Sequence, residues 1–233
     1  DLSLLTLQFG ENNLKETNDY KLVLTDPAQL AGLPQSAIDA AAETAKEKDV
    51  EGWVFTLQAP SYSPFMTYAS NRDLRCKLYM AYNTKCTHDN ETNNLEIVKK
   101  LVNTRLAIAQ LLGYSSFAEY NLQERMAENS GNVYKLLDQL LDAYTPTAKQ
   151  EYAEVEALAR QLEGNDFTVM PWDWSYYSHK LKDQKFQIDD EMLRPYFELS
   201  KVKEGVFGLA TRLYGITFKK NSDIPVYHKD VDA

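Results

Sequence analysis

The side chains best suited to chemistry are concentrated in one short stretch, residues 169–179, which reads V-M-P-W-D-W-S-Y-Y-S-H. It holds two of the three tryptophans, two adjacent tyrosines, an aspartate and one of only three histidines. Aromatic rings, an imidazole and a carboxylate together can bind a polar ligand, but they do not make a complete catalytic set. Two interpretations are open: an aromatic-rich helix buried in a helical core with its polar tips bonded locally, or a wall that faces a ligand.

A helix is expected to position these side chains. Pro171 favours an extended approach, and Asp173 is well placed to cap the amino terminus of a helix over 174–185. At helical spacing this segment carries an apolar row and a polar row on different faces. The apolar row, which can pack into the body of the protein, consists of Trp174, Tyr177 and Leu181. The row that offers polar groups to whatever lies opposite consists of Tyr176, His179, Lys180 and Asp183.

No familiar catalytic motif accompanies the stretch. A zinc hydrolase of the His-Glu-x-x-His type needs two histidines four residues apart on one helix face, and none of His88, His179 and His228 has such a partner. A metal pocket assembled from all three is conceivable, although three unrelated histidines usually lack a shared ion. Serine-nucleophile elbows and glycine-rich phosphate loops are absent, and Cys76 and Cys86 lack an aromatic–glycine context. The sequence therefore predicts no catalytic residue and no metal ligand in this chain.

Composition narrows the class of protein. The 233 residues are 44% hydrophobic and 25% charged, with a formal charge of −9, the profile of a soluble globular protein. Excess acid without basic clusters argues against binding to nucleic acid or to an anionic membrane, and no apolar run approaches the roughly 20 residues of a membrane helix. Two lone cysteines indicate a reducing compartment. We expect a cytoplasmic location, with a periplasmic one as the alternative because the sequence begins without an initiator methionine.

The remaining segments have an almost entirely helical pattern. Nine glycines and eight prolines are few for this length and favour long helices, of which we expect eight to ten. One helix is predicted over 2–17 with an interruption or kink near Gly10, and two are predicted over 133–162 with Pro146 as their joint. The strand candidates are 50–57 and 216–220.

The ends of the sequence and its internal breaks bear on domain organisation. Both ends lie within apolar patterns rather than polar tails, which favours a piece excised from a longer polypeptide. A turn at 164–166 and the proline at position 171 interrupt the helical pattern. We therefore expect residues 1–233 to be a fragment of one large helical domain, with a sub-boundary near 164–171.

Short motifs distributed over the whole chain carry a family resemblance. They read Q-F-G-E-N at 8–12, G-W-V-F-T-L at 52–57, P-S-Y-S-P-F-M-T-Y at 60–68, N-R-D-L-R at 71–75, I-A-Q-L-L-G-Y at 108–114, M-A-E-N at 126–129, P-W-D-W-S-Y-Y at 171–177, L-R-P-Y-F at 193–197 and L-Y-G-I-T-F at 213–218. In this order they resemble the amino-terminal half of the thimet-oligopeptidase-like zinc metallopeptidases. Their details are closest to the peptidyl-dipeptidase (dipeptidyl carboxypeptidase) branch, which removes dipeptides from the carboxyl ends of peptides.

This resemblance implies a mostly α fold with one or two short strands, forming a multi-helical lobe of a two-lobed protein built around a narrow channel. It implies zinc in the full-length parent, bound by a His-Glu-x-x-His helix and a further glutamate beyond position 233. No catalytic or metal residue is carried over to this chain, which is expected to bind no zinc and to be inactive alone. For Arg194, a surface ion pair with Asp190 or Glu191 is the alternative to a channel role. The residues expected to line the substrate channel are Trp172, Asp173, Tyr176, Tyr177, His179, Arg194 and Tyr196.

Two classes of function follow. The first is a non-catalytic portion of a zinc metallopeptidase that releases dipeptides from short peptides, or of an oligoendopeptidase of the same family. In that case the partners are short peptides and the missing carboxy-terminal catalytic half, and uncovered apolar surface is expected to cause self-association. The second class is a free-standing helical module that binds another protein through its aromatic surfaces.

Overall fold

The computed structural model describes residues 1–188, 190–221, 223–228 and 231. Its chain divides into two compact units, Asp1–Lys185 and Phe186–Ala233. The described residues form ten α-helices, three short 3-10 helices and one two-stranded sheet, which confirms the mostly α fold expected from the sequence. None of these helices has the length and the apolar character that a membrane crossing requires.

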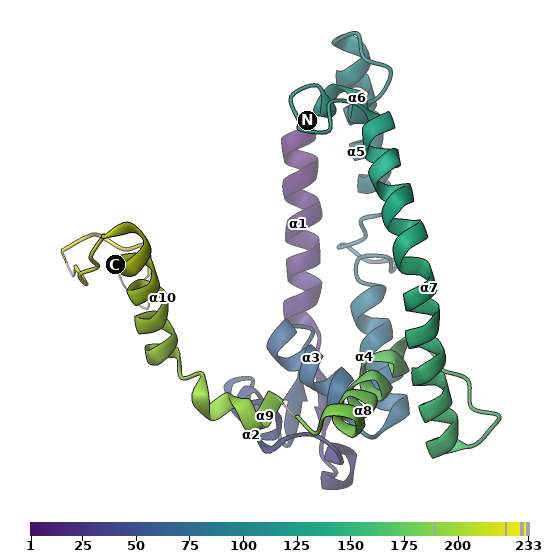
Figure 1. Ribbon diagram of the computed structural model, residues 1–233, viewed down its shortest axis with the longest axis vertical. Coiled ribbons are helices and arrows are strands. Elements are labelled where there is room, and N and C mark those ends of the chain that lie inside the picture. Colours follow the sequence, from purple (N-terminus) through teal and green to yellow (C-terminus); the bar gives the residue numbers. More distant parts are fainter. Residues whose placement is uncertain (189, 222, 229–230, 232–233) are drawn as a thin grey trace. The chain divides into compact units, whose positions relative to one another are not determined.

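Most of the secondary structure belongs to the first unit (Figure 1). Its elements follow in the order α1 (Leu2–Asp19), β1 (Leu22–Leu24), η1 (Pro27–Leu30), α2 (Gln35–Glu47), β2 (Trp53–Phe55), α3 (Ala59–Tyr68), α4 (Arg72–Asn83), α5 (Leu95–Leu111), α6 (Phe117–Leu122), α7 (Ser130–Glu163), η2 (Pro171–Asp173) and α8 (Trp174–Phe186).

A small sheet and the helices around it form the main hydrophobic core. Strands β1 and β2 pair antiparallel, with Leu22 opposite Phe55 and Leu24 opposite Trp53. Leu22 and Leu24 are buried while Val23 between them is exposed, the alternation of a strand with one buried face. β2 confirms the centre of the strand predicted over 50–57. Helices α2, α3 and α4 pack around this sheet and contribute buried side chains that include Ala41, Phe65 and Leu78.

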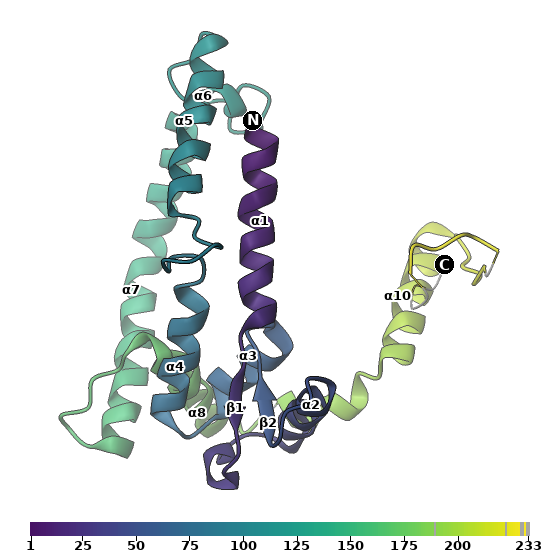
Figure 2. The same ribbon diagram turned by 180° about the vertical axis from the view of Figure 1, so that it is seen from behind.

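Helices α1 and α5 lie side by side in both views (Figures 1 and 2). Asn94, the residue before α5, accepts a hydrogen bond from Asn12 of α1 at 2.9 Å. Further along α1, the carboxylate of Glu16 accepts hydrogen bonds from the backbone N–H of Cys86 and the hydroxyl of Thr92. Burial acts to raise the pKa of Glu16, but its hydrogen bonds outweigh burial and hold that pKa below its ordinary value. A charged glutamate therefore fastens the loop before α5 to α1.

Three local predictions are wrong. α1 continues through Gly10 without a break, because a single glycine costs a helix only about 1 kcal/mol and packing against α5 outweighs this. α7 continues through Pro146 as one helix, because proline removes only one backbone hydrogen bond and the turns on either side keep theirs. No strand forms over 216–220, where the described residues offer no strand to pair with.

The second unit contains α9 (Asp190–Leu193), η3 (Arg194–Tyr196) and α10 (Leu199–Tyr214). Gly215 ends α10 in the left-handed conformation, with φ of 69°, and donates its N–H to the carbonyl oxygen of Thr211 at 2.8 Å. Glycine is the residue that most often ends a helix in this conformation.

The division between the two units follows Lys185, so the region 164–171 lies inside the first unit. Val169 in that region is buried against α7. Val169 and the partly buried Phe167 therefore hold this connecting segment against α7, although the turn at Gly164 interrupts the helical pattern.

Candidate functional site

Buried ion pairs hold the segment that leads into α8. η2 runs directly into α8, and the side chain of Asp173 at its end has no exposed surface. Its carboxylate accepts hydrogen bonds from Arg72 Nη2 at 2.7 Å, from Arg75 Nη2 at 2.9 Å and from the backbone N–H of Met170 at 3.0 Å. Both arginines belong to α4, 101 and 98 residues away in the sequence. The aspartate thus joins the motif N-R-D-L-R to the motif P-W-D-W-S-Y-Y.

Both arginines have additional partners, which Arg75 in particular requires because its charge is buried. Arg75, which is 1% exposed, donates to the carbonyl oxygen of Ala69 at 2.7 Å and lies 4.1 Å from the centre of the Tyr176 ring. Arg72 lies 4.4 Å from the centre of the Phe167 ring. The cluster therefore fixes Tyr176 on α8 as well as the backbone before it.

Asp173 carries a charge in this cluster. Burial by itself raises the pKa of a carboxyl, but hydrogen bonds from Arg72, Met170 and Arg75 outweigh it and hold the pKa of Asp173 below its ordinary value. The prediction that Asp173 caps α8 is wrong, because its carboxylate bonds to the arginines and to the Met170 N–H, and η2 takes the place of a capped start. Trp172 beside it is half-buried, with its ring centre 6.2 Å from that of Tyr79.

The apolar row of α8 packs against the carboxyl-terminal part of α7, as its spacing predicts. Tyr177 is 2% exposed and lies with Ala159 in a second core cluster. Its hydroxyl donates to Glu163 Oε1 at 3.0 Å, and burial together with this carboxylate raises the pKa of Tyr177. Trp174 stacks on Tyr152, with ring centres 5.7 Å apart and planes 7° from parallel.

The polar row of α8 lines a cavity of about 160 Å³. His179 lies edge-on to Tyr68, with ring centres 4.6 Å apart, and Lys180 Nζ lies 4.8 Å from the centre of the Tyr176 ring. The opposite wall comes from the turn after η1 and from the end of α3. The cavity is lined by Gly32, Thr67, Tyr68 and Ser70 on that side and by Tyr176, His179, Lys180 and Asp183 on the α8 side.

This α8 cavity suits the binding of a small polar group. Lys180 supplies an ammonium, Asp183 a carboxylate and His179 an imidazole, so both signs of charge and both hydrogen-bonding roles are present. Its volume equals that of a few water molecules, at roughly 30 Å³ each. Such a space accommodates a peptide group or a chain end rather than a whole small molecule.

Gly32→Ala is expected to destabilise the wall opposite α8. Gly32 has φ of +87°, and a Cβ there would lie 2.3 Å from the carbonyl oxygen of Tyr68 and 2.4 Å from Ser70 Oγ. The left-handed backbone and this close approach predict a loss of about 1–3 kcal/mol in the free energy of unfolding. Denaturant titration followed by circular dichroism measures it. Gly113→Ala is the matched control, since Gly113 has φ of +85° but nothing within 4 Å. Equal losses in the two variants would contradict a role for the close approach.

The other two expected channel residues belong to the second unit. Arg194 pairs with Glu191 at 2.6 Å, which is one of the two ion pairs that the sequence offered as its alternative role. The side chain of Asp190, the other acid considered, lies outside the described residues. Tyr196 is 77% exposed.

Sequence reasoning missed Arg72 and Arg75 as the residues that position α8. A signal was present: two arginines three residues apart lie on one helix face directly after the cap Asn71. One of them, Arg75, is among the most buried side chains of the first unit. An arginine pair of this kind requires a buried acid opposite, but spacing alone does not say which acid.

The described histidines do not form a metal centre. His88 lies near Glu16 in the loop before α5, and His179 lies against Tyr68. Within the described ranges there is no group of three or more His, Cys, Asp or Glu side chains that could hold a metal ion. The residues described here therefore do not fit a zinc site, and no step through zinc is assigned to them.

Comparison with known proteins gives matches along the chain. The sequence profile of peptidase family M3 matches residues 65–233. The chain is 39% identical to Oligopeptidase A of Escherichia coli (strain K12), 34% identical to Dipeptidyl carboxypeptidase of the same strain and 34% identical to Probable cytosolic oligopeptidase A of Arabidopsis thaliana. Each match covers 99% of this chain but 34% of the relative. The chain therefore spans about a third of the length of these curated relatives.

Proposed function

We propose that this chain, which belongs to peptidase family M3, forms a non-catalytic helical portion of a zinc metallopeptidase that cleaves short peptides. Its membership confirms the resemblance carried by the short motifs. The observation that carries the proposal is the meeting of two of these motifs in the buried cluster of Arg72, Arg75 and Asp173, which orients α8. We place the zinc and its ligands in the part of the relatives that this chain does not match.

The α8 cavity is the part of this chain that we propose faces substrate. Lys180 can pair with a peptide carboxylate or carbonyl, and the rings of Tyr176 and His179 can pack against the peptide. Trp172, Asp173 and Tyr177 support this wall from inside the fold. A channel role for Arg194 and Tyr196 stays a prediction.

The first test is the coding sequence downstream of the Ala233 codon. An in-frame His-Glu-x-x-His helix with a further glutamate is expected there. An immediate stop codon would favour the alternative, a free-standing helical module that binds another protein. Metal analysis and a peptide-release assay on the 233-residue chain form the second test, and zinc-dependent turnover by this chain alone would contradict the proposed division of labour.

Substitution of the polar row in the full-length parent tests the substrate wall. Lys180→Met removes the ammonium and keeps the aliphatic stem, so we expect KM for a short peptide to rise about tenfold, the effect of losing one charge-assisted hydrogen bond. Gln184→Ala is the control, because Gln184 is exposed on the same helix and does not line the cavity. Unchanged KM in Lys180→Met would remove this lysine from the substrate wall.

Two cleavage patterns are supported by the relatives. The motifs favour release of dipeptides from the carboxyl end, and one relative is named a dipeptidyl carboxypeptidase, whereas two others are named oligopeptidases. A peptide with an amidated carboxyl end distinguishes them in the full-length parent. Loss of cleavage on amidation indicates carboxyl-end dipeptide release, and unchanged internal cleavage indicates an oligoendopeptidase.

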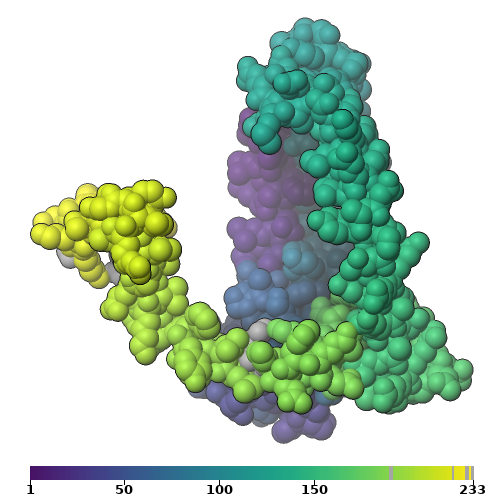
Figure 3. Space-filling view, in the orientation of Figure 1, coloured from purple at the N-terminus to yellow at the C-terminus, as the bar shows by residue number. Residues whose placement is uncertain are grey.

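Exposed apolar side chains support packing against further polypeptide. In the amino-terminal half of α7, Tyr134, Leu137, Leu141 and Tyr144 recur at helical spacing and are each more than half exposed. In the space-filling view this half of α7 stands along one edge of the first unit, with a hollow between it and α1 (Figure 3). Surfaces of this kind mark interaction sites, and we propose that the remainder of the peptidase covers this one.

Self-association of the isolated chain is the expected consequence of that surface. Sedimentation velocity over a range of concentrations should show a weight-average mass that rises above the 26.7 kDa of the monomer. Replacing Leu137 and Leu141 together by lysine should shift the population toward monomer, whereas the same change at the exposed polar residues Gln139 and Asp142 should not. A monomer at all concentrations would contradict this prediction.

Location stays a proposal. We propose a cytoplasmic parent, which is supported by the two lone cysteines and by a relative named as a probable cytosolic oligopeptidase. Fractionation of cells that express the full-length parent tests it, and recovery in a periplasmic fraction would overturn it.

A further inference from the structure

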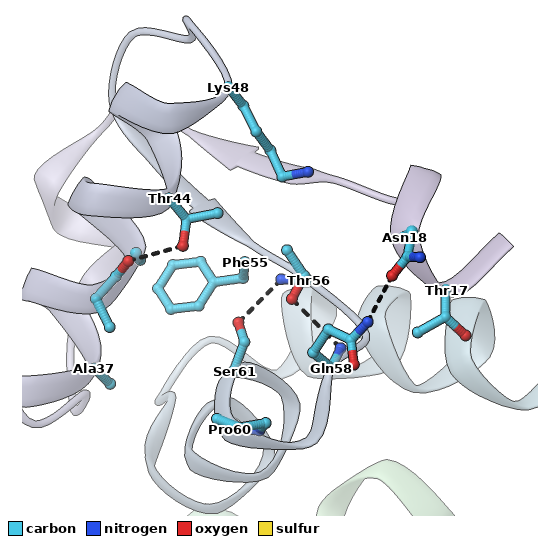
Figure 4. Close-up of a pocket in the computed structure, with 12 residues that line it drawn as sticks. Thr17, Asn18, Ala37, Thr44, Lys48, Phe55, Thr56, Gln58, Pro60 and Ser61 are labelled. Atoms are coloured by element: carbon cyan, nitrogen blue, oxygen red, sulfur yellow. Dashed lines mark hydrogen bonds between the residues drawn. The ribbon is translucent and has the colours of Figure 1, made fainter. Parts of the chain in front are cut away.

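A second cavity, of about 400 Å³, lies in the first unit between the end of α1, one face of α2 and the connection from β2 to α3 (Figure 4). It is separate from the α8 cavity and shares no residue with it. Its lining residues divide into an apolar floor and a polar rim. A group the size of a water molecule takes roughly 30 Å³ or more, so this volume is sufficient for a molecule of six to ten heavy atoms.

The floor of the cavity is apolar. Three alanines of α2, at positions 37, 40 and 41, present one small-residue face, and Phe55 and Pro60 lie across from it. Phe55 is 1% exposed and is fixed by its edge-on contact with Phe65, whose ring centre lies 4.7 Å away. A rigid apolar floor of this kind binds a compact hydrocarbon body.

Among the described residues that line the cavity, the rim carries one cation and no anion. Figure 4 shows the side chain of Lys48 reaching from the end of α2 over the cavity. Among the described residues, no hydrogen bond or ion pair engages its ammonium, whereas Lys46 on the same helix pairs with Glu43 at 3.2 Å. The described lining residues include no Asp or Glu. An unpaired ammonium beside an apolar floor favours an anionic ligand group.

The other polar groups of the rim leave donors available. Ser61 Oγ accepts from the backbone N–H of Thr56 at 3.0 Å, so its own hydroxyl hydrogen is free to donate to a ligand. Asn18 Oδ1 accepts from Gln58 Nε2 at 2.7 Å, which leaves the Asn18 amide nitrogen as a donor near the mouth. These groups favour an acceptor such as a carboxylate, and they offer no charged partner for an amine.

We propose that this cavity binds a carboxylate attached to a compact apolar body, with the carboxylate at Lys48 and the body on the alanine face of α2 and Phe55. The absence of an acidic group in the lining excludes a free amino group from the favoured ligands. Two sources share this chemistry: a short monocarboxylic acid and the carboxyl end of a short peptide. The site is independent of the proposed peptidase function, because it contains none of the α8 residues.

Ligand-observed saturation-transfer NMR on the 233-residue chain tests the proposal and tolerates self-association. Hexanoate is expected to bind, and hexanamide, which has the same body without the charge, is expected to bind about tenfold more weakly. Acetyl-alanyl-alanine and its carboxamide form the second pair. Tighter binding of the acetyl dipeptide than of hexanoate identifies a peptide carboxyl end as the source, and the reverse order identifies a free monocarboxylate. Equal binding of acid and amide in both pairs would overturn the proposal.

Two variants and a control locate the site. Lys48→Met is expected to weaken hexanoate binding about tenfold and to leave hexanamide unchanged. Ala40→Leu, at an exposed position on the floor, is expected to reduce both. Lys46→Met, which removes an exposed lysine two residues away, should change neither by more than about twofold. Circular dichroism confirms that each variant is folded. Hexanoate affinity that falls equally in Lys46→Met and Lys48→Met, or in neither, would overturn the assignment.

Discussion

Replacing Asp173 by asparagine is expected to lower the free energy of unfolding by about 3–5 kcal/mol, the usual cost of removing one partner from a buried ion pair. The substitution keeps the size and shape of the side chain but removes the charge of the acid that pairs with Arg75, which is 1% exposed. It also weakens the hold on Arg72 and on the Met170 N–H. A large loss of stability is therefore expected from this one substitution at the junction between α4 and α8.

Urea unfolding followed by circular dichroism measures this loss. Asp166→Asn is the matched control, because Asp166 is exposed in the turn after α7, and it should change stability by no more than about 0.5 kcal/mol. A loss below about 1 kcal/mol in Asp173→Asn would show that the buried cluster is not what joins the two motifs.

Acid is expected to abolish the contribution of the Asp173 carboxylate to the free energy of unfolding. The pKa of Asp173 in the folded chain lies below its ordinary value of 3.8, so the carboxylate binds protons less readily when folded than when unfolded. Its stabilisation is fully present above the ordinary pKa and is lost as the pH falls through the folded-state pKa. The stability difference between the native chain and Asp173→Asn should stay constant between about pH 5 and 7 and shrink below the ordinary pKa. A difference that shrinks at neutral pH would contradict this assignment.

Tyr177→Ala is expected to lower the free energy of unfolding by about 3–5 kcal/mol, as for other large buried aromatic side chains. Tyr177 is 2% exposed and fills the space between α8 and α7 beside Val155 and Ala159. Its removal leaves a cavity on the face of α8 opposite to the proposed substrate wall. The helix then loses its anchor, so the hydrogen-exchange protection of α8 should fall together with the global stability.

Tyr177→Phe separates the ring from the hydroxyl. It keeps the packing against Phe167, whose ring centre lies 5.5 Å away, and removes only the hydrogen bond to Glu163. Because Glu163 is itself exposed, we expect a loss of about 1 kcal/mol. Urea unfolding of the two variants compares these costs. Similar losses in the alanine and phenylalanine variants would show that the hydroxyl, rather than the buried ring, anchors α8.

Local pattern was sufficient for much of the helical structure. Asn71 and Ser116 cap α4 and α6, and Gly215 ends α10. Residue types of this kind can be read from the sequence, because capping depends on residues within one turn. The division of α8 into a packed row and a polar row also followed from spacing alone. The same local reasoning failed at Gly10 and Pro146, where long helices continue through residues that would end short ones.

Which groups meet across the fold was decided only by the tertiary structure. The sequence marked Asp173 as chemically interesting but offered a helix cap as its role, because its partners Arg72 and Arg75 lie about a hundred positions earlier. In the same way, the polar row of α8 was predictable, while the wall formed opposite by Gly32 and Tyr68 was not. Periodicity acts over a few turns, whereas ion pairs and cavities depend on how whole elements pack, so local sequence specifies the faces and packing chooses their partners.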